Sequence, residues 1–348
     1  MIKDSNVDPG AGIGVDKLAF PAFISGKHTD GSLPKVVWVA KGGADAAGAT
    51  GVSHVGSRSE PFLTIWGANG AQAYTVDGRG DRIILGPGTW RENGDFGSGT
   101  GTTGSAGRMN KRDIGIFGSG GAHVGRTQIV GDGTTTGPTI RVRDGYLRGF
   151  VLADVEVGSV DSADADRAQP LIDLETVDAT ATLTATSSDE FAVLRNVKLD
   201  GGATATAGVV FTGAQQVRCY SLEVLGCTYG FVFRGSTVNF PDNLRFWDTI
   251  FGDNVTADIF TTTGTEGQWG FPGGTTNMTN VLFVRNMYTD RGGTPVTNYV
   301  NAVGTMVNVM DFEFVAARDV ADDTLMALPA NWVAIGRSAA AAEFIIGA

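Results

Sequence analysis

Five short stretches of the chain resemble one another, and their spacing constrains the fold more than any other feature. Each opens on a polar residue and continues as a β-rich run: Asn196 to Gly201 (NVKLDG), Ser221 to Gly226 (SLEVLG), Asp248 to Asp253 (DTIFGD), Asn280 to Arg285 (NVLFVR) and Asp311 to Ala316 (DFEFVA). Their first residues are 25, 27, 32 and 31 positions apart. A repeated strand unit cannot bury its apolar face alone and must stack on copies of itself. The spacing therefore predicts a solenoid.

Composition supports a large folded body. The chain has 348 residues, of which 42% are hydrophobic and 18% charged, so it can bury a core and is not expected to be globally disordered. Its 51 glycines follow no triplet repeat, which excludes collagen and indicates many turns. The formal net charge of −11, without any run of Lys or Arg, argues against nucleic acid as a partner.

The sequence also argues against a membrane partner, a disulfide framework and a zinc site. It contains no run of eighteen apolar residues, and its first residues lack the apolar region of a secretory signal. Two cysteines, Cys219 and Cys227, are too few for a disulfide framework and are expected as small buried hydrophobes. With three histidines in the chain, a zinc site is poorly supplied.

The chain divides into four regions by composition. We expect an extended arm at 1–34 that orders against a partner, an N-terminal strand and capping helix at 35–80, a coil of strands at 81–320, and a cap or oligomer contact at 321–348. Within the second region, Ser59 is expected as a helix N-cap with Pro61 in the first turn. Phe62, Ile65 and Trp66 would then share one helical face.

Beyond residue 80 the pattern is one of short strands without long helices. Such strands also suit a sandwich or barrel, but few two-residue hairpin turns of the Asn-Gly or Asp-Gly kind occur. A rung of roughly 20–30 residues with about three strands favours a parallel coil instead. The region would then hold roughly nine or ten rungs and extend about 45 Å.

Three pieces of residues 35–92 carry a family resemblance: VVWVAKGGADA, SEPFLTIWGANGAQAYTV and GDRIILGPGTWREN. They resemble the opening of right-handed parallel β-helix proteins of the pectate-lyase-like superfamily. The resemblance implies an all-β fold, a right-handed single-stranded parallel β-helix with an N-terminal capping helix, behind an extended N-terminal arm. It says almost nothing about function, because one fold hosts many chemistries.

The first residues carry a second resemblance. The stretch from Ile2 to Leu18 has an Asp-rich lead, an A-x-I core and a K-L ending, and it resembles a pattern common in tailed-phage appendage proteins. The resemblance implies a tailspike-like or head-spike protein located on the virion, a homotrimer whose partners are capsid or tail proteins and host surface polysaccharide. The docking residues would be the apolar ones of this stretch: Ile2, Val7, Ile13, Val15 and Leu18.

Phage β-helices often cleave host polysaccharide, and many glycosidases use two carboxylates. The carboxylate candidates are Asp248, Asp253 and Asp290, and the candidates for stacking on sugar rings are Trp247, Trp269 and Tyr288. The same Asp residues can instead sit at turns and cap backbone amides. The motif set of polygalacturonases is absent. The loop from Gly264 to Thr276, which carries Trp269, can equally pack against the rod or a neighbouring subunit.

No cofactor is expected, and calcium is the metal for which the chain offers carboxylate ligands. Carboxylates suited to it stand around an acidic insertion: Asp154, Glu156, Asp161, Asp164, Asp166 and Asp173. Their spacing matches no calcium loop, and a solvated acidic loop explains it as well. The leading function is a structural virion spike docked by its arm. There are two alternatives. One is a polysaccharide depolymerase of the tailspike type, acting as a glycosidase or a lyase, and the other is a cellular polysaccharide lyase.

Overall fold

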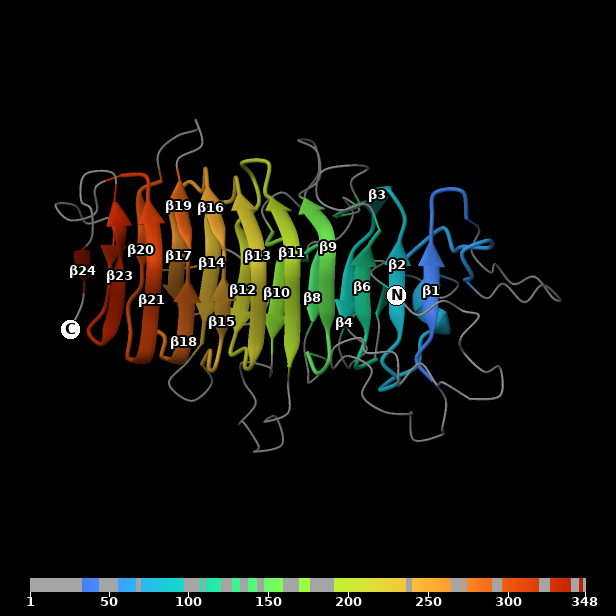
Figure 1. Ribbon diagram of the computed structural model, residues 1–348, viewed down its shortest axis with the longest axis horizontal. Coiled ribbons are helices and arrows are strands. Elements are labelled where there is room, and N and C mark those ends of the chain that lie inside the picture. Colours follow the sequence, from blue (N-terminus) through green and yellow to red (C-terminus); the bar gives the residue numbers. More distant parts are fainter. Residues whose placement is uncertain are drawn as a thin grey trace, which may run out of the picture.

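The computed structural model describes residues 33–43, 56–66, 70–96, 107–108, 111–119, 127–131, 137–142, 147–158, 169–175, 191–235, 240–263, 271, 274–289, 296–318, 326–338 and 344–346. These residues form two long sheets, here called sheet A and sheet B (Figure 1). Sheet A has 15 strands and sheet B has 9 among the described residues.

The strands of sheet A are β1 (Val36–Val39), β2 (Arg82–Leu85), β3 (Gly88–Arg91), β6 (Gly115–Gly118), β7 (Thr127–Val130), β9 (Val151–Gly158), β11 (Ala192–Asp200), β13 (Val217–Leu225), β15 (Arg245–Trp247), β16 (Ile250–Gly252), β18 (Met278–Val284), β19 (Met287–Thr289), β21 (Met306–Ala316), β23 (Trp332–Ser338) and β24 (Phe344–Ile346). Those of sheet B are β4 (Gly94–Phe96), β5 (Gly107–Arg108), β8 (Ile140–Val142), β10 (Ile172–Glu175), β12 (Ala207–Thr212), β14 (Tyr229–Arg234), β17 (Ala257–Thr262), β20 (Asn298–Asn301) and β22 (Met326–Ala327).

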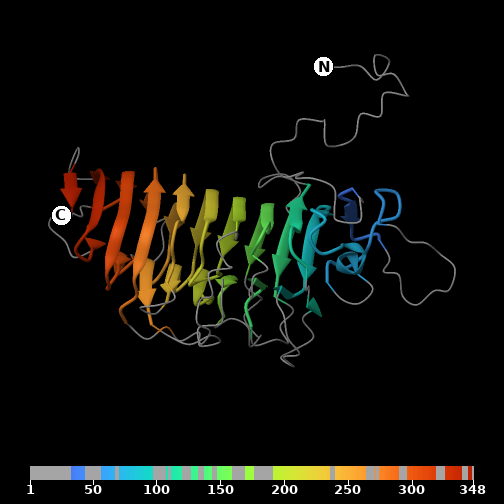
Figure 2. The same cartoon turned by 90° about the horizontal axis from the view of Figure 1, so that it is seen from below.

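Successive turns of the chain lie side by side in parallel. The chain runs through sheet A, crosses to sheet B and returns to sheet A one strand further along, as from β9 to β10 to β11. The pairing of β23 with β24 is antiparallel, and every other pairing between described strands is parallel. Figure 2 shows the result as a narrow rod whose colours follow one another from end to end. The predicted all-β parallel coil is confirmed, and its right-handedness stays a prediction.

The core fills the space between the two sheets. One inward column of sheet A runs through Leu152, Leu194, Cys219, Phe246 and Phe283, each fully buried and in register with the next. The rings of Phe246 and Phe283 stack with their centroids 4.7 Å apart. Side chains of one rung therefore pack on those of the next, which is how each rung buries an apolar face that it cannot bury alone.

Left-handed backbone residues bend sheet A along its length. One residue per rung, between an outward-facing residue and a buried one, has φ between 51° and 60°. Together these form the bend column: Asp154, Asn196, Ser221, Asp248, Arg285 and Glu313. Asp and Asn tolerate this conformation better than most residues because their short polar side chains bond locally. The bend column is where the strand turns from one facet of the coil to the next.

The repeats found in the sequence align with this column only in part. Asn196, Ser221 and Asp248 open the first three repeats and occupy the bend column. Asn280 opens the fourth, but the bend of that rung lies at Arg285. Asp311 opens the fifth, yet it pairs with Phe283 and points into the core. The last two repeats were therefore aligned in the wrong register.

A second column of left-handed residues lies where the chain enters sheet A. Here called the turn column, it contains Gly80, Asp113, Gly149, Gln216, Asn243, Asn280, Asn308 and Asn331. The Asn308 side-chain amide donates to Oδ1 of Asn280 at 3.0 Å, so neighbouring turns bond to each other through their side chains. Near the N-terminal end, glycine and aspartate take these places instead of asparagine.

The predicted helix beginning at Ser59 is wrong over the described residues. Phe62 forms an extended bridge to Val39, and the single helical turn in this part is the 3₁₀ helix η3 (Ala71–Tyr74). The reason is that the backbone N–H groups of this segment donate to a carboxylate that is distant in the sequence. Oε2 of Glu92 accepts from the backbone N–H groups of Ile65 and Trp66, both at 2.9 Å.

The apolar face expected for that helix is nevertheless buried. Phe62, Ile65 and Trp66 are all in the core, where they close the N-terminal end of the coil. The expected cap at Ser59 is replaced by Ser57, whose Oγ accepts from the backbone N–H of Glu60 at 3.1 Å. At the other end, β23 continues sheet A beyond residue 320, where the sequence placed the end of the coil.

Candidate functional site

Asp248, the first carboxylate candidate, lies in the bend column and is engaged by the next rung. Arg285 donates to it through two nitrogens, Nε to Oδ1 at 2.7 Å and a terminal nitrogen to Oδ2 at 3.0 Å. These hydrogen bonds hold the pKa of Asp248 below its usual value. A carboxylate held ionised in this way suits a surface ion pair and is a poor general acid.

The structure does not bring the three carboxylate candidates together as a described pair. Asp253 lies in the turn after β16 with φ of 56°, a position typical of a turn aspartate. Asp290 lies outside the described residues. Asp248 pairs with the Arg285 side chain. The interpretation of these residues as caps of backbone amides stays a prediction.

Trp247 lies on the outer face of sheet A beside Tyr220 of the previous rung. The two rings stack with centroids 4.7 Å apart and planes 4° from parallel. Stacking along the rod axis makes one face of each ring cover the other, so the ring edges face outward. Since sugars bind aromatic faces, this geometry fits a packing surface better than a sugar platform.

Tyr288 cannot stack on a glycan, because its side chain is fully buried in the core. Its hydroxyl donates to Oδ2 of Asp311 at 2.6 Å, and its ring stacks on Phe251. This corrects the assignment of Tyr288 as a glycan-binding residue. The sequence offered it as an aromatic residue close to Asp290, whereas it occupies an inward position of β19.

Two further predictions fall outside the described residues. Trp269 and the five docking residues Ile2, Val7, Ile13, Val15 and Leu18 are not described by the structure. Phe271, from the same loop as Trp269, is buried against Tyr229 of β14, with ring centroids 5.9 Å apart. This part of the loop packs on the outer face of sheet B of the same chain.

The calcium candidates that are described contact basic groups. Asp154 lies 3.4 Å from Arg195, and Glu156 lies 3.6 Å from Lys198. Asp173 is buried on the outward side of β10, 3.3 Å from Nε of Arg141. Asp161, Asp164 and Asp166 are not described. Within the described residues, no group of three or more potential metal ligands occurs.

Sequence reasoning missed a pocket on the outer face of sheet A, near the starts of β2, β6 and β9. Its volume is about 360 Å³. The charged residues that line it are Arg79, Asp81, Arg82, Asp113 and Arg148, and the aromatic ones are Phe117 and Phe191. Three arginines against two aspartates give the pocket a basic lining in a chain of net charge −11.

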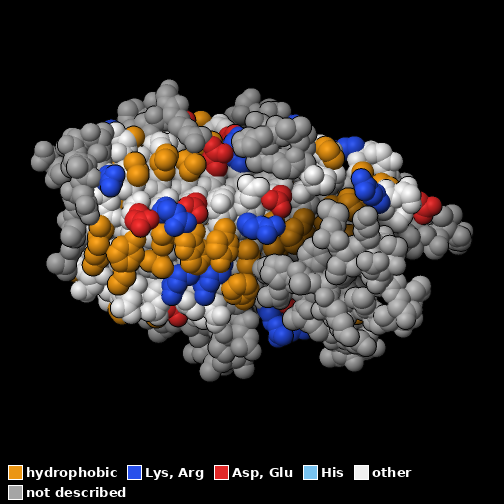
Figure 3. Space-filling view, in the orientation of Figure 1, with side chains coloured by type: hydrophobic (Ala, Val, Ile, Leu, Met, Phe, Trp, Pro, Cys, Tyr) orange, Lys and Arg blue, Asp and Glu red, His pale blue; other side chains and the backbone are white. Residues whose placement is uncertain are grey.

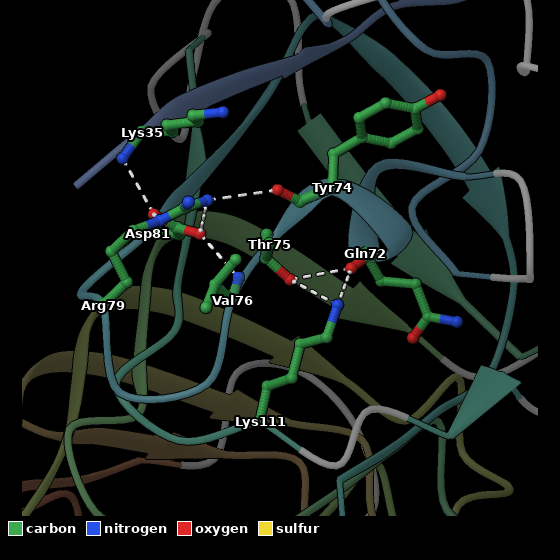
Figure 4. A network of polar contacts seen from close by, with 8 residues as sticks. All are labelled: Lys35, Gln72, Tyr74, Thr75, Val76, Arg79, Asp81 and Lys111. Atoms are coloured by element: carbon green, nitrogen blue, oxygen red, sulfur yellow. Dashed lines mark hydrogen bonds and ion pairs between the residues drawn. The ribbon is translucent and has the colours of Figure 1, made fainter. Parts of the chain in front are cut away.

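One wall of the pocket rests on a buried ion pair (Figure 4). Arg79 donates to both oxygens of Asp81, through Nε at 2.6 Å and a terminal nitrogen at 2.5 Å. The same carboxylate accepts the backbone N–H groups of Lys35 at 2.8 Å and Val76 at 2.7 Å. Asp81 therefore accepts four hydrogen bonds, and these contacts hold the chain segments around the pocket together.

The outer face of sheet A also carries an apolar column toward the C-terminal end. Five residues in register on successive rungs form the apolar face: Tyr220, Trp247, Val284, Phe312 and Ile335. Leu282, Met310 and Val333 flank it on one side, and Ile250, Met287 and Val315 on the other. Figure 3 shows the resulting orange band along the rod.

These features define the class of protein: a parallel β-helix with an apolar outer face and a basic pocket, as the strand order shows directly. No family model and no curated protein matches the chain. No described helix is both long and apolar enough to cross a membrane. Both cysteines are buried and free, and burial raises the pKa of each thiol.

Three solved structures are similar to the chain at low identity. ORF18 of Geobacillus virus E2 has 10% identity and a TM-score of 0.47, and the match covers 77% of this chain and 57% of that one. The pectate lyase Pel9A has 15% identity and a TM-score of 0.32, over 79% and 78% of the two chains. The pectin methylesterase PemA from Erwinia chrysanthemi has 12% identity and a TM-score of 0.31, over 88% and 90%. All three scores are low, so the fold assignment rests on the strand pairing.

Proposed function

We propose that this chain is the rod-shaped body of a virion spike that assembles with copies of itself through the apolar face. The observation that carries the proposal is the run of Tyr220, Trp247, Val284, Phe312 and Ile335 along one outer face. Monomeric proteins rarely expose a contiguous apolar patch that spans several strands. Tyrosine, tryptophan, phenylalanine and methionine are also the residues enriched at protein interfaces.

Charges of alternating sign stand beside this face. In the bend column, Asp248, Arg285 and Glu313 stand on successive rungs with alternating sign, and Arg285 is bonded to Asp248. In a closed ring of copies this charged line would lie at the edge of the apolar face, where an interface is polar. The partners proposed for this face are a second and third copy of this chain, which gives the homotrimer implied by the phage resemblance.

The N-terminal stretch supplies the docking part of the proposal. Its resemblance to tailed-phage appendage proteins favours attachment of residues 1–34 to a capsid or tail protein. A chain lacking residues 1–20 should fold as a β-rich rod and fail to assemble onto particles. If the shortened chain still decorates virions, the docking role is wrong. The depolymerase alternative gains nothing from Asp248, whose carboxylate is bonded to Arg285.

Assembly is tested by molar mass in solution, with a matched pair of variants. Val315, exposed by 45%, lies beside the apolar face, and Val255, exposed by 44%, lies in the turn before β17. Light scattering should give a trimer for the wild type and for Val255→Glu. Val315→Glu should shift the protein toward monomer, because it places a charge in an interface core. A monomeric wild type, or a trimer unaffected by Val315→Glu, would overturn the proposal.

A further inference from the structure

The pocket at the starts of β2, β6 and β9 has a wall of three arginines, Arg79, Arg82 and Arg148. Among the described residues, neither Arg82 nor Arg148 has a carboxylate within 4.0 Å, whereas Arg79 is paired with Asp81. Arg82 is held partly out of solvent, with its guanidinium 5.6 Å from the ring centroid of Phe117. A partly buried cation without a counter-charge is costly, so the wall favours an anion.

Glycines open the floor of the pocket. A Cβ at Gly149 would lie 2.0 Å from Oδ1 of Asp113, so the Asp113 carboxyl fills the space that any larger residue would need. Gly149 also has φ of 66°, which other residues rarely adopt. A Cβ at Gly115 would meet the Phe117 ring at 2.4 Å. The absence of these two side chains lets Asp113 and Phe117 lie against the backbone and leaves the cavity free above them.

The acid in the pocket limits which anion fits. Burial raises the pKa of Asp113, and the nearby guanidinium groups of Arg148 and Arg112 oppose that shift. A carboxyl beside the arginines repels a dianionic phosphate more strongly than a monoanion. The ring of Phe117, partly exposed, and that of Phe191, exposed by 36%, add apolar surface beside the charged groups. A volume of about 360 Å³ lies at the lower end of ligand sites, which span roughly 300–1,000 Å³.

We propose that this pocket binds a small ring-shaped carboxylate, with the carboxylate on Arg82 and Arg148 and the ring against Phe117 and Phe191. A guanidinium presents paired N–H donors that match a carboxylate, which makes such contacts both strong and directional. The site lies on rungs different from those of the apolar face. It is therefore independent of the assembly proposed above, and either proposal can fail without the other.

The test is a ligand-observed NMR titration of the full chain at low salt and neutral pH. The probes are glucuronate, an acidic sugar; benzoate, an aromatic acid; glucose, the neutral counterpart of glucuronate; and inorganic phosphate. We expect saturable binding of glucuronate, benzoate or both, with Kd in about the millimolar range, and none of glucose. Binding of glucuronate alone identifies an acidic sugar as the ligand class, and binding of benzoate alone identifies an aromatic acid.

Variants locate the binding. The double change Arg82→Gln and Arg148→Gln should weaken carboxylate binding by about ten-fold or more, because charge-assisted hydrogen bonds are lost. Phe191→Ala should weaken it less. Arg337→Gln, an exposed arginine on β23, is the matched control and should change nothing. Circular dichroism verifies that each variant is folded. The proposal is overturned if no carboxylate binds, if glucose or phosphate binds as tightly, or if the folded double variant binds as the wild type does.

Discussion

The hydroxyl of Tyr288 donates to Oδ2 of Asp311 at 2.6 Å inside the core of the rod, where both side chains are fully buried. Asp311 occupies the inward column that Phe246 and Phe283 fill on the preceding rungs, and Ala334 follows it on the next. Burial raises the pKa of Asp311 to about 7, and the hydrogen bond from Tyr288 opposes the shift. The apolar stack thus contains a carboxyl that is stable there in its neutral form.

This carboxyl predicts a stability that falls as pH rises. Unfolded Asp311 releases its proton near pH 4, whereas the folded protein keeps it until about pH 7. Between these values the folded state binds more protons, so the group's contribution is full below pH 4 and is lost by pH 7. The loss is on the order of 4 kcal/mol. Urea unfolding of wild type and Asp311→Asn across this window measures it. The variant should lack this component, and an identical pH slope in both proteins would refute the assignment.

The left-handed conformation of Asp248 predicts a difference between two substitutions that both remove its ion pair with Arg285. Glycine adopts φ of 57° without strain, whereas a β-branched residue does not. Asp248→Val should therefore be less stable than Asp248→Gly by about 1–2 kcal/mol. Losing the exposed ion pair itself should cost under about 1 kcal/mol. Urea midpoints of the two variants test this, and equal midpoints would show that the bend column carries no backbone strain.

Glu92 predicts how the N-terminal end of the coil is held. Its carboxylate accepts the backbone N–H groups of Ile65 and Trp66, two buried residues. Glu92→Ala leaves these donors without that acceptor, which should cost about 1–3 kcal/mol and speed hydrogen exchange at both amides. The exposed Glu313→Ala is a control that should leave exchange there unchanged. Unchanged protection in Glu92→Ala would mean that this carboxylate does not hold the segment.

Sequence reasoning succeeded where one rung resembles the next. Asn196, Ser221 and Asp248 occupy equivalent positions that require a positive φ, so residues suited to left-handed turns recur there. The register failed at Asn280 and Asp311 because insertions change the length of the later rungs. The helix at Ser59 failed because the acceptors of its amides, such as Glu92, are distant in sequence.

The pocket was missed for a related reason. Arg82, Asp113, Arg148 and Phe191 stand one to a rung, 31, 35 and 43 residues apart, in a chain with 26 Lys and Arg residues spread along it. No local motif marks them, and they become neighbours only once the strands are in register. Likewise, the outward position of Trp247 and the inward position of Tyr288 depend on the alternation of side chains along a strand. If a strand boundary is predicted one residue off, every side chain of that strand is assigned to the wrong face.

The antiparallel strand β24 marks where the parallel coil stops. It bonds to Ala334, Ile335 and Gly336 of β23, the last parallel strand of sheet A. An exposed strand edge is a template for pairing with another chain, and here three residues of the same chain already cover it. The parallel stacking of sheet A therefore ends at β23, because the strand next to it runs in the opposite direction and does not offer another parallel rung.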